Sequence, residues 1–184
     1  MFLETEKMLK ILYSPVIYSH PTHLPDSIHN MNNEDNVLIN YWLITHYQLK
    51  DLPAHWEARD SISLLILSRW ELIHDAACMI GGYLLRCQLL KKCATLMSNP
   101  RLSSFISLPI RHHVLLANTE NNLDTLSLGV AFVLSQIPHL PIGLKERVIL
   151  ILPAEIKLPE IYIARCPDHL NLLKMAINYA IDYK

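Results

Sequence analysis

Apolar residues recur at intervals of three and four along most of the chain, the spacing that places side chains on one face of an α-helix. Residues 3–13 predict a short amphipathic helix that ends before Pro15. Residues 37–49 predict a second helix, with capping candidates in the polar patch 30–36. Three prolines between these helices predict an irregular connecting segment over residues 14–33.

The longest regular element is expected between Ser61 and Met97, where one apolar stripe continues at helical spacing. The stripe comprises Leu64, Leu65, Leu67, Leu72, Ile73, Ala76, Ala77, Ile80, Leu84, Leu85, Leu89 and Leu90. Gly81 and Gly82 interrupt it. Since each glycine costs a helix roughly 1 kcal/mol relative to alanine, the pair indicates a kink or a close crossing by another helix. Asn99-Pro100 ends the element.

The remaining third also has a helical pattern. Helices are expected over residues 101–108, 110–117, 123–136, 144–152 and 167–183. Two stretches, 146–153 and 156–164, gather β-branched residues and leave short strands as an alternative. The predicted fold class is mainly α: a single compact multi-helix domain over residues 1–184, with one or two short strands in the C-terminal third left open.

Composition agrees with one domain that buries a real core. The chain has 184 residues, of which 51% are hydrophobic and 18% charged, which is more apolar than an average soluble protein. The excess indicates a deep core, a surface patch that a partner covers, or both.

The net charge of −1 argues against binding to nucleic acid or anionic lipid, but the charges are unevenly distributed. Residues 1–60 hold four Lys/Arg against eight Asp/Glu, and residues 61–119 hold six against two. The basic part is either a solvated helix face or an electropositive docking surface. The basic residues between Asp75 and Glu120 are Arg86, Lys91, Lys92, Arg101 and Arg111.

The sequence indicates a cytoplasmic protein without membrane insertion. Its four cysteines show no CxxC spacing and are interpreted as small buried residues in a reducing compartment. The first ten residues lack the pattern of a signal peptide. Residues 125–144 carry no charge, but Pro138 and Pro141 interrupt them, so a buried helix followed by a loop is expected.

No constellation of residues predicts catalysis, a metal, a cofactor or a small-molecule substrate. His20 and His23 flank Pro21 without a nearby Cys or Glu, and His112 and His113 are adjacent, so neither pair has a metal-ligand spacing. There is no GxSxG elbow, and the four glycines cannot form a nucleotide-binding loop.

Large aromatic side chains are candidates for the core and for interfaces, the core being the commoner place. Trp56 is the interface candidate among them. It lies in a predicted loop between Pro53 and the charged residues that follow it, a setting that favours partial exposure.

Three segments resemble the OrgA/MxiK family of type III secretion, also called SctK. They are SPVIYSHPTHLP, RWELIHDAACMIGGYLLRCQLLKKC and NPRLSSFISLP. The matching residues are Pro15, Tyr18 and Pro21; Trp70, Leu72, Ala76, Ala77, Gly81 and Arg86; and Phe105, Leu108 and Pro109. The resemblance covers residues 9–109 and consists of packing residues.

The resemblance implies a non-enzymatic adaptor on the cytosolic face of the secretion apparatus. Its partners would be the cytosolic domain of the inner-membrane ring protein and the pod protein beneath it. In that role Arg86, Lys91, Lys92, Arg101 and Arg111 would face one partner, and the acidic N-terminal third would face the other. An alternative from another class is a helical chaperone or regulator that binds a partner helix in an apolar groove. An enzyme of unrecognised family is the third interpretation.

Overall fold

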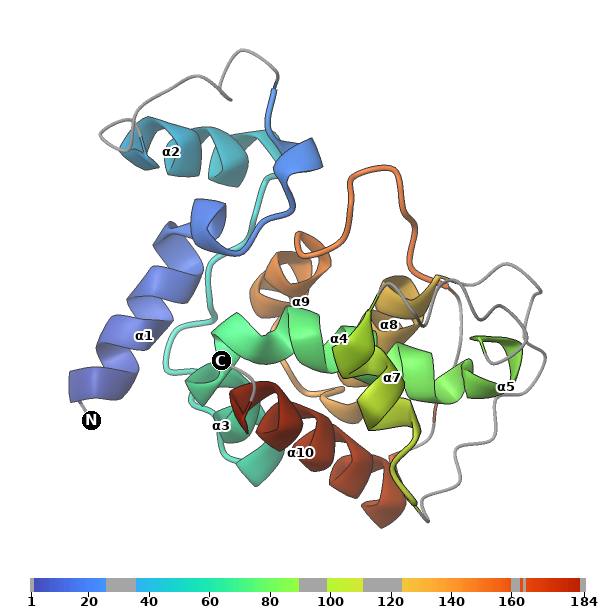
Figure 1. Ribbon diagram of the computed structural model, residues 1–184. Coiled ribbons are helices and arrows are strands. Elements are labelled where there is room, and N and C mark those ends of the chain that lie inside the picture. The colour runs from blue at the N-terminus through green and yellow to red at the C-terminus, as the bar shows by residue number, and fades with distance from the viewer. Residues whose placement is uncertain are drawn as a thin grey trace. The chain divides into compact units, whose positions relative to one another are not determined.

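A computed structural model of the protein describes residues 2–25, 36–89, 99–110, 124–159, 163 and 165–182, and in these ranges the regular elements are helices (Figure 1). The mainly α class is therefore confirmed. The chain forms two compact units. Unit 1 contains Met1–Glu71 and His139–Lys157, and unit 2 contains Leu72–Pro138 and Leu158–Lys184. That the whole chain acts as a single domain stays a prediction.

In unit 1 the N-terminal helix α1 (Phe2–Tyr13) packs against three other helices. These are α2 (Asn36–His46), α3 (Ser61–Ser68) and α9 (Ile142–Ile149). The face predicted for α1 is confirmed at Ile11 and Leu12, which are both buried. Residues 14–25 of the predicted irregular segment contain two single-turn 3₁₀ helices, η1 (Pro15–Ile17) and η2 (Pro21–His23). Residues 26–33 of that segment lie outside the described ranges.

A fully buried arginine ties the parts of unit 1 together. The Arg147 guanidinium donates through Nε and Nη2 to the Leu12 carbonyl, at 3.2 and 2.9 Å, near the C-terminal end of α1. Through Nη1 it donates to the carbonyls of Lys50 and Gly143, both at 2.7 Å. These carbonyl oxygens compensate for the loss of water around the buried charge.

Helix α2 is shorter than predicted. It ends at His46 instead of continuing to residue 49, because Gln48 takes a left-handed conformation with φ of 49°. The amide of Leu49 donates to the Ile44 carbonyl at 3.0 Å and closes the helix end. A left-handed glutamine carries no sequence signal of the kind that glycine would give.

The prediction of one long element over residues 61–97 is wrong. Helix α3 ends at Ser68, the 3₁₀ turn η5 (Trp70–Leu72) follows, and α4 (Ile73–Leu84) then begins. Arg69 has φ of −125° and leaves the helical conformation, and Trp70 packs edge-on against Tyr18 with ring centroids 5.6 Å apart. The chain passes from unit 1 to unit 2 at this break. Leu64, placed in the predicted stripe, is 44% exposed.

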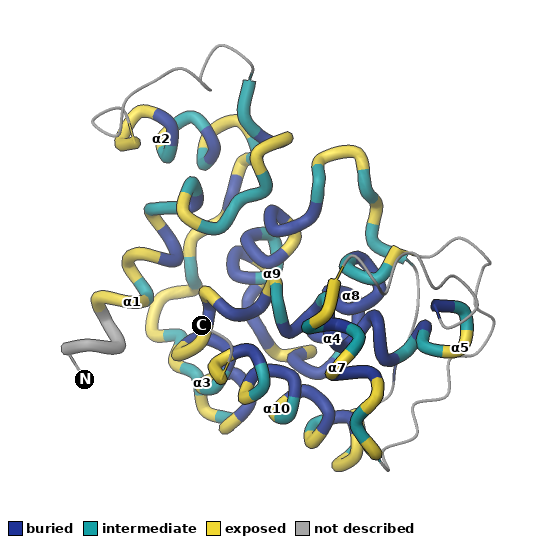
Figure 2. Tube along the Cα trace, in the orientation of Figure 1, coloured by how far each residue is buried: buried dark blue, intermediate teal, exposed yellow. Residues whose placement is uncertain are grey.

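In unit 2, α4 is the central helix, and three others pack against it (Figure 1). They are α7 (Pro100–Ile106), α8 (Thr125–Gln136) and α10 (Pro167–Asp182); the short α5 (Arg86–Leu89) follows α4. Figure 2 shows α4 and α8 as largely buried. The predicted burial of the uncharged stretch that begins at Thr125 is confirmed by α8.

Glycines make the crossing of α4 and α8 possible. A Cβ at Gly81 would overlap the Thr125 carbonyl, and one at Gly129 would overlap the Ala77 carbonyl. The close crossing expected from the glycine pair is confirmed. Helix α4 continues through both glycines to Leu84, so they do not interrupt it.

The strand alternative is wrong for residues 146–153, which form the end of α9 and the turn after it. Residues 156–159 and 163 of the second stretch are not in a strand either, and its other residues lie outside the described ranges. Of the short helices, α7 is confirmed, whereas the one expected at 110–117 falls almost wholly outside the description.

Candidate protein-interaction site

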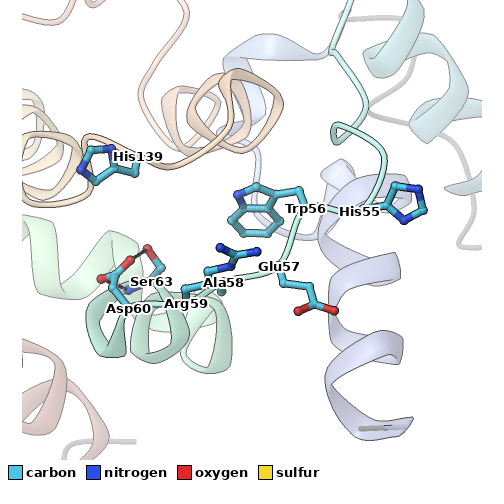
Figure 3. Close-up of a pocket in the computed structure, with 8 residues that line it drawn as sticks. All are labelled: His55, Trp56, Glu57, Ala58, Arg59, Asp60, Ser63 and His139. Carbon is cyan, nitrogen blue, oxygen red and sulfur yellow. Dashed lines mark hydrogen bonds between the residues drawn. The ribbon is translucent and has the colours of Figure 1, made fainter.

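The loop before α3 surrounds a hollow of about 400 Å³ (Figure 3). All of its lining residues belong to unit 1. They are His55, Trp56, Glu57, Ala58, Arg59, Asp60, Ser63 and His139. Trp56, the aromatic interface candidate, is half-buried there and keeps part of its indole accessible. The partial exposure expected from its loop setting is therefore present.

Local backbone contacts hold the loop in place. His55 has φ of 64°, a left-handed conformation that few residues other than glycine adopt. The amide of Trp56 donates to the Pro53 carbonyl at 3.1 Å and closes the turn. The Asp60 carboxylate accepts from the amides of Ile62 and Ser63, both at 3.1 Å, and so caps α3. The hollow is consequently anchored to a helix at one end.

The charges around the hollow are not equally available. The Asp60 carboxylate is occupied by the first turn of α3, and it also accepts from the Ser63 hydroxyl. The Glu57 carboxylate extends away from the Trp56 ring (Figure 3). The Arg59 side chain is exposed and extends toward that ring (Figure 3). The charge presented beside the indole is therefore the guanidinium of Arg59.

The basic interface candidates all belong to unit 2. Arg86 lies over the Tyr83 ring, 4.3 Å from its centroid, and donates to the Tyr83 carbonyl at 3.0 Å. Arg101 Nη1 lies 3.5 Å from Asp75 Oδ2. Both side chains are partly exposed. Lys91, Lys92 and Arg111 lie outside the described residues, so the basic surface stays a prediction.

The outer face of α2 is a second exposed apolar surface. Val37 is 76% exposed, Leu38 62% and Tyr41 68%, while Ile39 and Leu43 are buried on the opposite face. This surface was not predicted from the sequence. A signal was present, because residues 36–46 contain no Asp, Glu, Lys or Arg and are apolar around most of the circumference. Arg59 was missed too, although it lies three residues after Trp56.

The cysteines of the described ranges differ in their surroundings. Burial raises the pKa of the Cys78 thiol to about 12, so it stays protonated at neutral pH. Cys87 is exposed, and Cys78 and Cys166 are only partly buried, which contradicts the expectation of buried cysteines. Cys93 lies outside the described residues. The described residues contain no group of three or more His, Cys, Asp or Glu that could hold a metal ion.

Residues 8–182 match the model of the family described as bacterial type III secretion apparatus protein (OrgA_MxiK). The chain belongs to this family. The resemblance noted over residues 9–109 is confirmed, and the OrgA_MxiK match continues through α8, α9 and α10. No curated protein and no solved structure matches the chain.

OrgA_MxiK proteins are type III secretion apparatus proteins, so the partners of this member are to be sought among the proteins of that system. Within the part of the chain that the structure describes, no helix combines the length and apolar character needed to span a bilayer.

Proposed function

We propose that this OrgA_MxiK protein is a non-catalytic cytoplasmic adaptor of the type III secretion sorting platform. It links the cytosolic domain of the inner-membrane ring protein to the pod protein. One observation carries the proposal beyond family membership: a single chain of this family folds as two compact units, each with its own helical core. An adaptor needs separate surfaces on stable bodies, and two such units can provide them.

The surfaces available on the two units differ in chemistry. Unit 1 carries the Trp56 hollow and the apolar face of α2. Unit 2 carries Arg86 and Arg101, the described members of the basic stretch. Different chemistry at each surface supports binding of two different partners at the same time.

Pairwise binding of the purified chain to the ring-protein domain and to the pod protein tests the proposal. Both complexes are expected to form. Charge reversal at Lys91, Lys92 and Arg101 together should weaken one complex at least tenfold and leave the other within about twofold. Lys50→Glu, an exposed charge reversal in unit 1, is the matched control. If the wild-type chain binds neither protein, the adaptor function is wrong; if the triple variant binds both normally, the basic surface is wrong.

A second candidate function is a chaperone or regulator that binds a partner helix. The outer face of α2 favours it, because an exposed apolar helix face can pack against an amphipathic helix. Stable co-purification with a secreted effector, and not with the ring or pod protein, would favour this function over the adaptor.

A further inference from the structure

We infer that the Trp56 hollow receives an acidic segment of a partner protein, whose carboxylate pairs with Arg59 while a neighbouring large apolar side chain packs on the Trp56 indole. This inference rests on the proposed adaptor function and deepens it, because it assigns a chemistry to one of the partner contacts.

The first support is the accessible aromatic surface. Trp56 keeps part of its surface accessible to solvent, although burying a tryptophan removes a large apolar area from water. Partly exposed tryptophans set in hollows are frequent anchors of protein interfaces. The other two tryptophans differ in setting, since Trp70 is 6% exposed in the core and Trp42 stacks on His46 with centroids 4.4 Å apart.

The second support is the charge beside that surface. In the described part of the chain no anionic group lies within ion-pair distance of Arg59, whose guanidinium extends toward the indole (Figure 3). Asp60 is adjacent in sequence, and its carboxylate accepts from the amides of Ile62 and Ser63 in the first turn of α3. A guanidinium binds a carboxylate through two parallel N–H donors, so an aspartate or glutamate is its best partner.

The third support is pre-organisation. The left-handed His55, the hydrogen bond from the Trp56 amide to the Pro53 carbonyl and the Asp60 cap hold the loop before any partner binds. Binding then requires little ordering of this chain, which lowers the entropic cost of association. A hollow of about 400 Å³ has room for a large apolar side chain together with a neighbouring carboxylate.

The test uses 15-residue synthetic peptides that tile the ring-protein cytosolic domain and the pod protein, with binding to the full chain followed by fluorescence anisotropy. We expect the peptides that bind to be acidic and to contain a large apolar residue. Replacing their Asp and Glu by Asn and Gln should weaken binding at least tenfold. Higher salt should weaken it as well, since a partly exposed ion pair is screened.

Variants of the chain locate the contact. Arg59→Glu and Trp56→Ala are each expected to weaken peptide binding at least tenfold, and a peptide with Lys in place of the pairing Glu should restore binding to Arg59→Glu. Arg69→Glu is the matched control: Arg69 is exposed in the same unit and follows α3 at the other end from Asp60. It should stay within twofold of the wild type, and circular dichroism checks that each variant is folded.

The outcomes separate this inference from the adaptor function. Suppose that the wild-type chain binds both full-length partners, and that Arg59→Glu binds the same partners and the peptides as tightly as the wild type. The hollow is then not the contact, and the adaptor function stands. If the bound peptides are neutral or basic, the inference is overturned in the same way. If the wild-type chain binds neither full-length partner, both proposals fail together.

Discussion

Arg147 carries a positive charge inside unit 1, where its partners are carbonyl oxygens near helix ends and turns. Backbone carbonyls at the end of α1 lack partners within the helix, so an arginine from α9 can satisfy them. Tyr18 adds to this arrangement by donating to the Ile11 carbonyl at 2.6 Å, and burial raises the pKa of its hydroxyl. The charge thus has a structural role in joining α1 to α9.

Replacement of Arg147 by Met is expected to lower the free energy of unfolding by about 2–4 kcal/mol, since buried carbonyls lose their donors. Arg147→Lys should also destabilise, because one ammonium cannot reproduce the fork of the guanidinium. Urea denaturation followed by tryptophan fluorescence measures both. Arg69→Met, an exposed control, should change little; equal stability of Arg147→Met and the wild type would contradict the structural role.

His23 is buried as a neutral imidazole. Its Nε2 lies 2.7 Å from the Leu152 carbonyl and must donate to it, so Nδ1 accepts from the Tyr47 hydroxyl at 2.9 Å. Burial lowers the pKa of His23, and the Leu152 carbonyl and Glu155 oppose that effect more weakly. The unfolded chain therefore binds the proton more tightly than the folded protein does.

The contribution of neutral His23 to the free energy of unfolding should therefore be fully present above about pH 6.5, the ordinary pKa of histidine. It should decrease as the pH falls below that value toward the lowered pKa of the folded state. Urea midpoints measured between pH 7.5 and pH 5 by tryptophan fluorescence check this. His23→Gln should flatten the dependence, whereas His74→Gln, which replaces an exposed imidazole, should keep it. A His23→Gln profile parallel to that of the wild type would contradict the assignment.

Helices α4 and α8 cross closely, and backbone atoms line the contact between them. The space that a side chain would need at Gly81 and at Gly129 is occupied by carbonyl groups of the opposite helix. Carbonyls within helices cannot rotate away without breaking the helix, so this contact tolerates no larger residue. At Gly82 the neighbour is instead the flexible side chain of Leu102.

Gly129→Ala should therefore destabilise the protein by about 3 kcal/mol, at the upper end of overpacking effects. Gly82→Ala, in α4 next to Gly81, is the matched control, because its neighbour is a side chain of α7. It should cost far less, because Leu102 can change rotamer and alanine favours the helix by about 1 kcal/mol over glycine. Thermal unfolding followed by circular dichroism ranks the two variants, and a smaller effect of Gly129→Ala would contradict the described crossing.

The elements also show the limit of a periodic pattern. The apolar spacing of three and four located α1, α8 and α10 well, since each is one uninterrupted amphipathic or buried helix. It failed across Arg69, where the spacing continues through a break. The spacing of apolar residues indicates which side chains are buried, but it does not show whether the backbone between them stays helical. One non-helical residue between two buried stripes therefore leaves the pattern almost unchanged.

At the scale of the molecule, the three tryptophans at 42, 56 and 70 all belong to unit 1, and unit 2 has none. Fluorescence therefore reports on unit 1, while far-ultraviolet circular dichroism reports on the helices of both. If the chain is the single domain that we predict, the two probes should give the same urea midpoint. Gly129→Ala, a change in unit 2, should shift the fluorescence midpoint as much as the dichroism midpoint. Separate midpoints would mean that the units unfold independently.

The sequence by itself determined the helical class, most helices and the family, because these depend on local periodicity and on residue types at fixed spacing. It also indicated that Trp56 has an accessible setting. Only the tertiary structure decided that the chain divides near Glu71 and that Arg147 lies in the interior. Both features depend on contacts between residues far apart in the sequence. No local pattern encodes which distant carbonyl a side chain will meet.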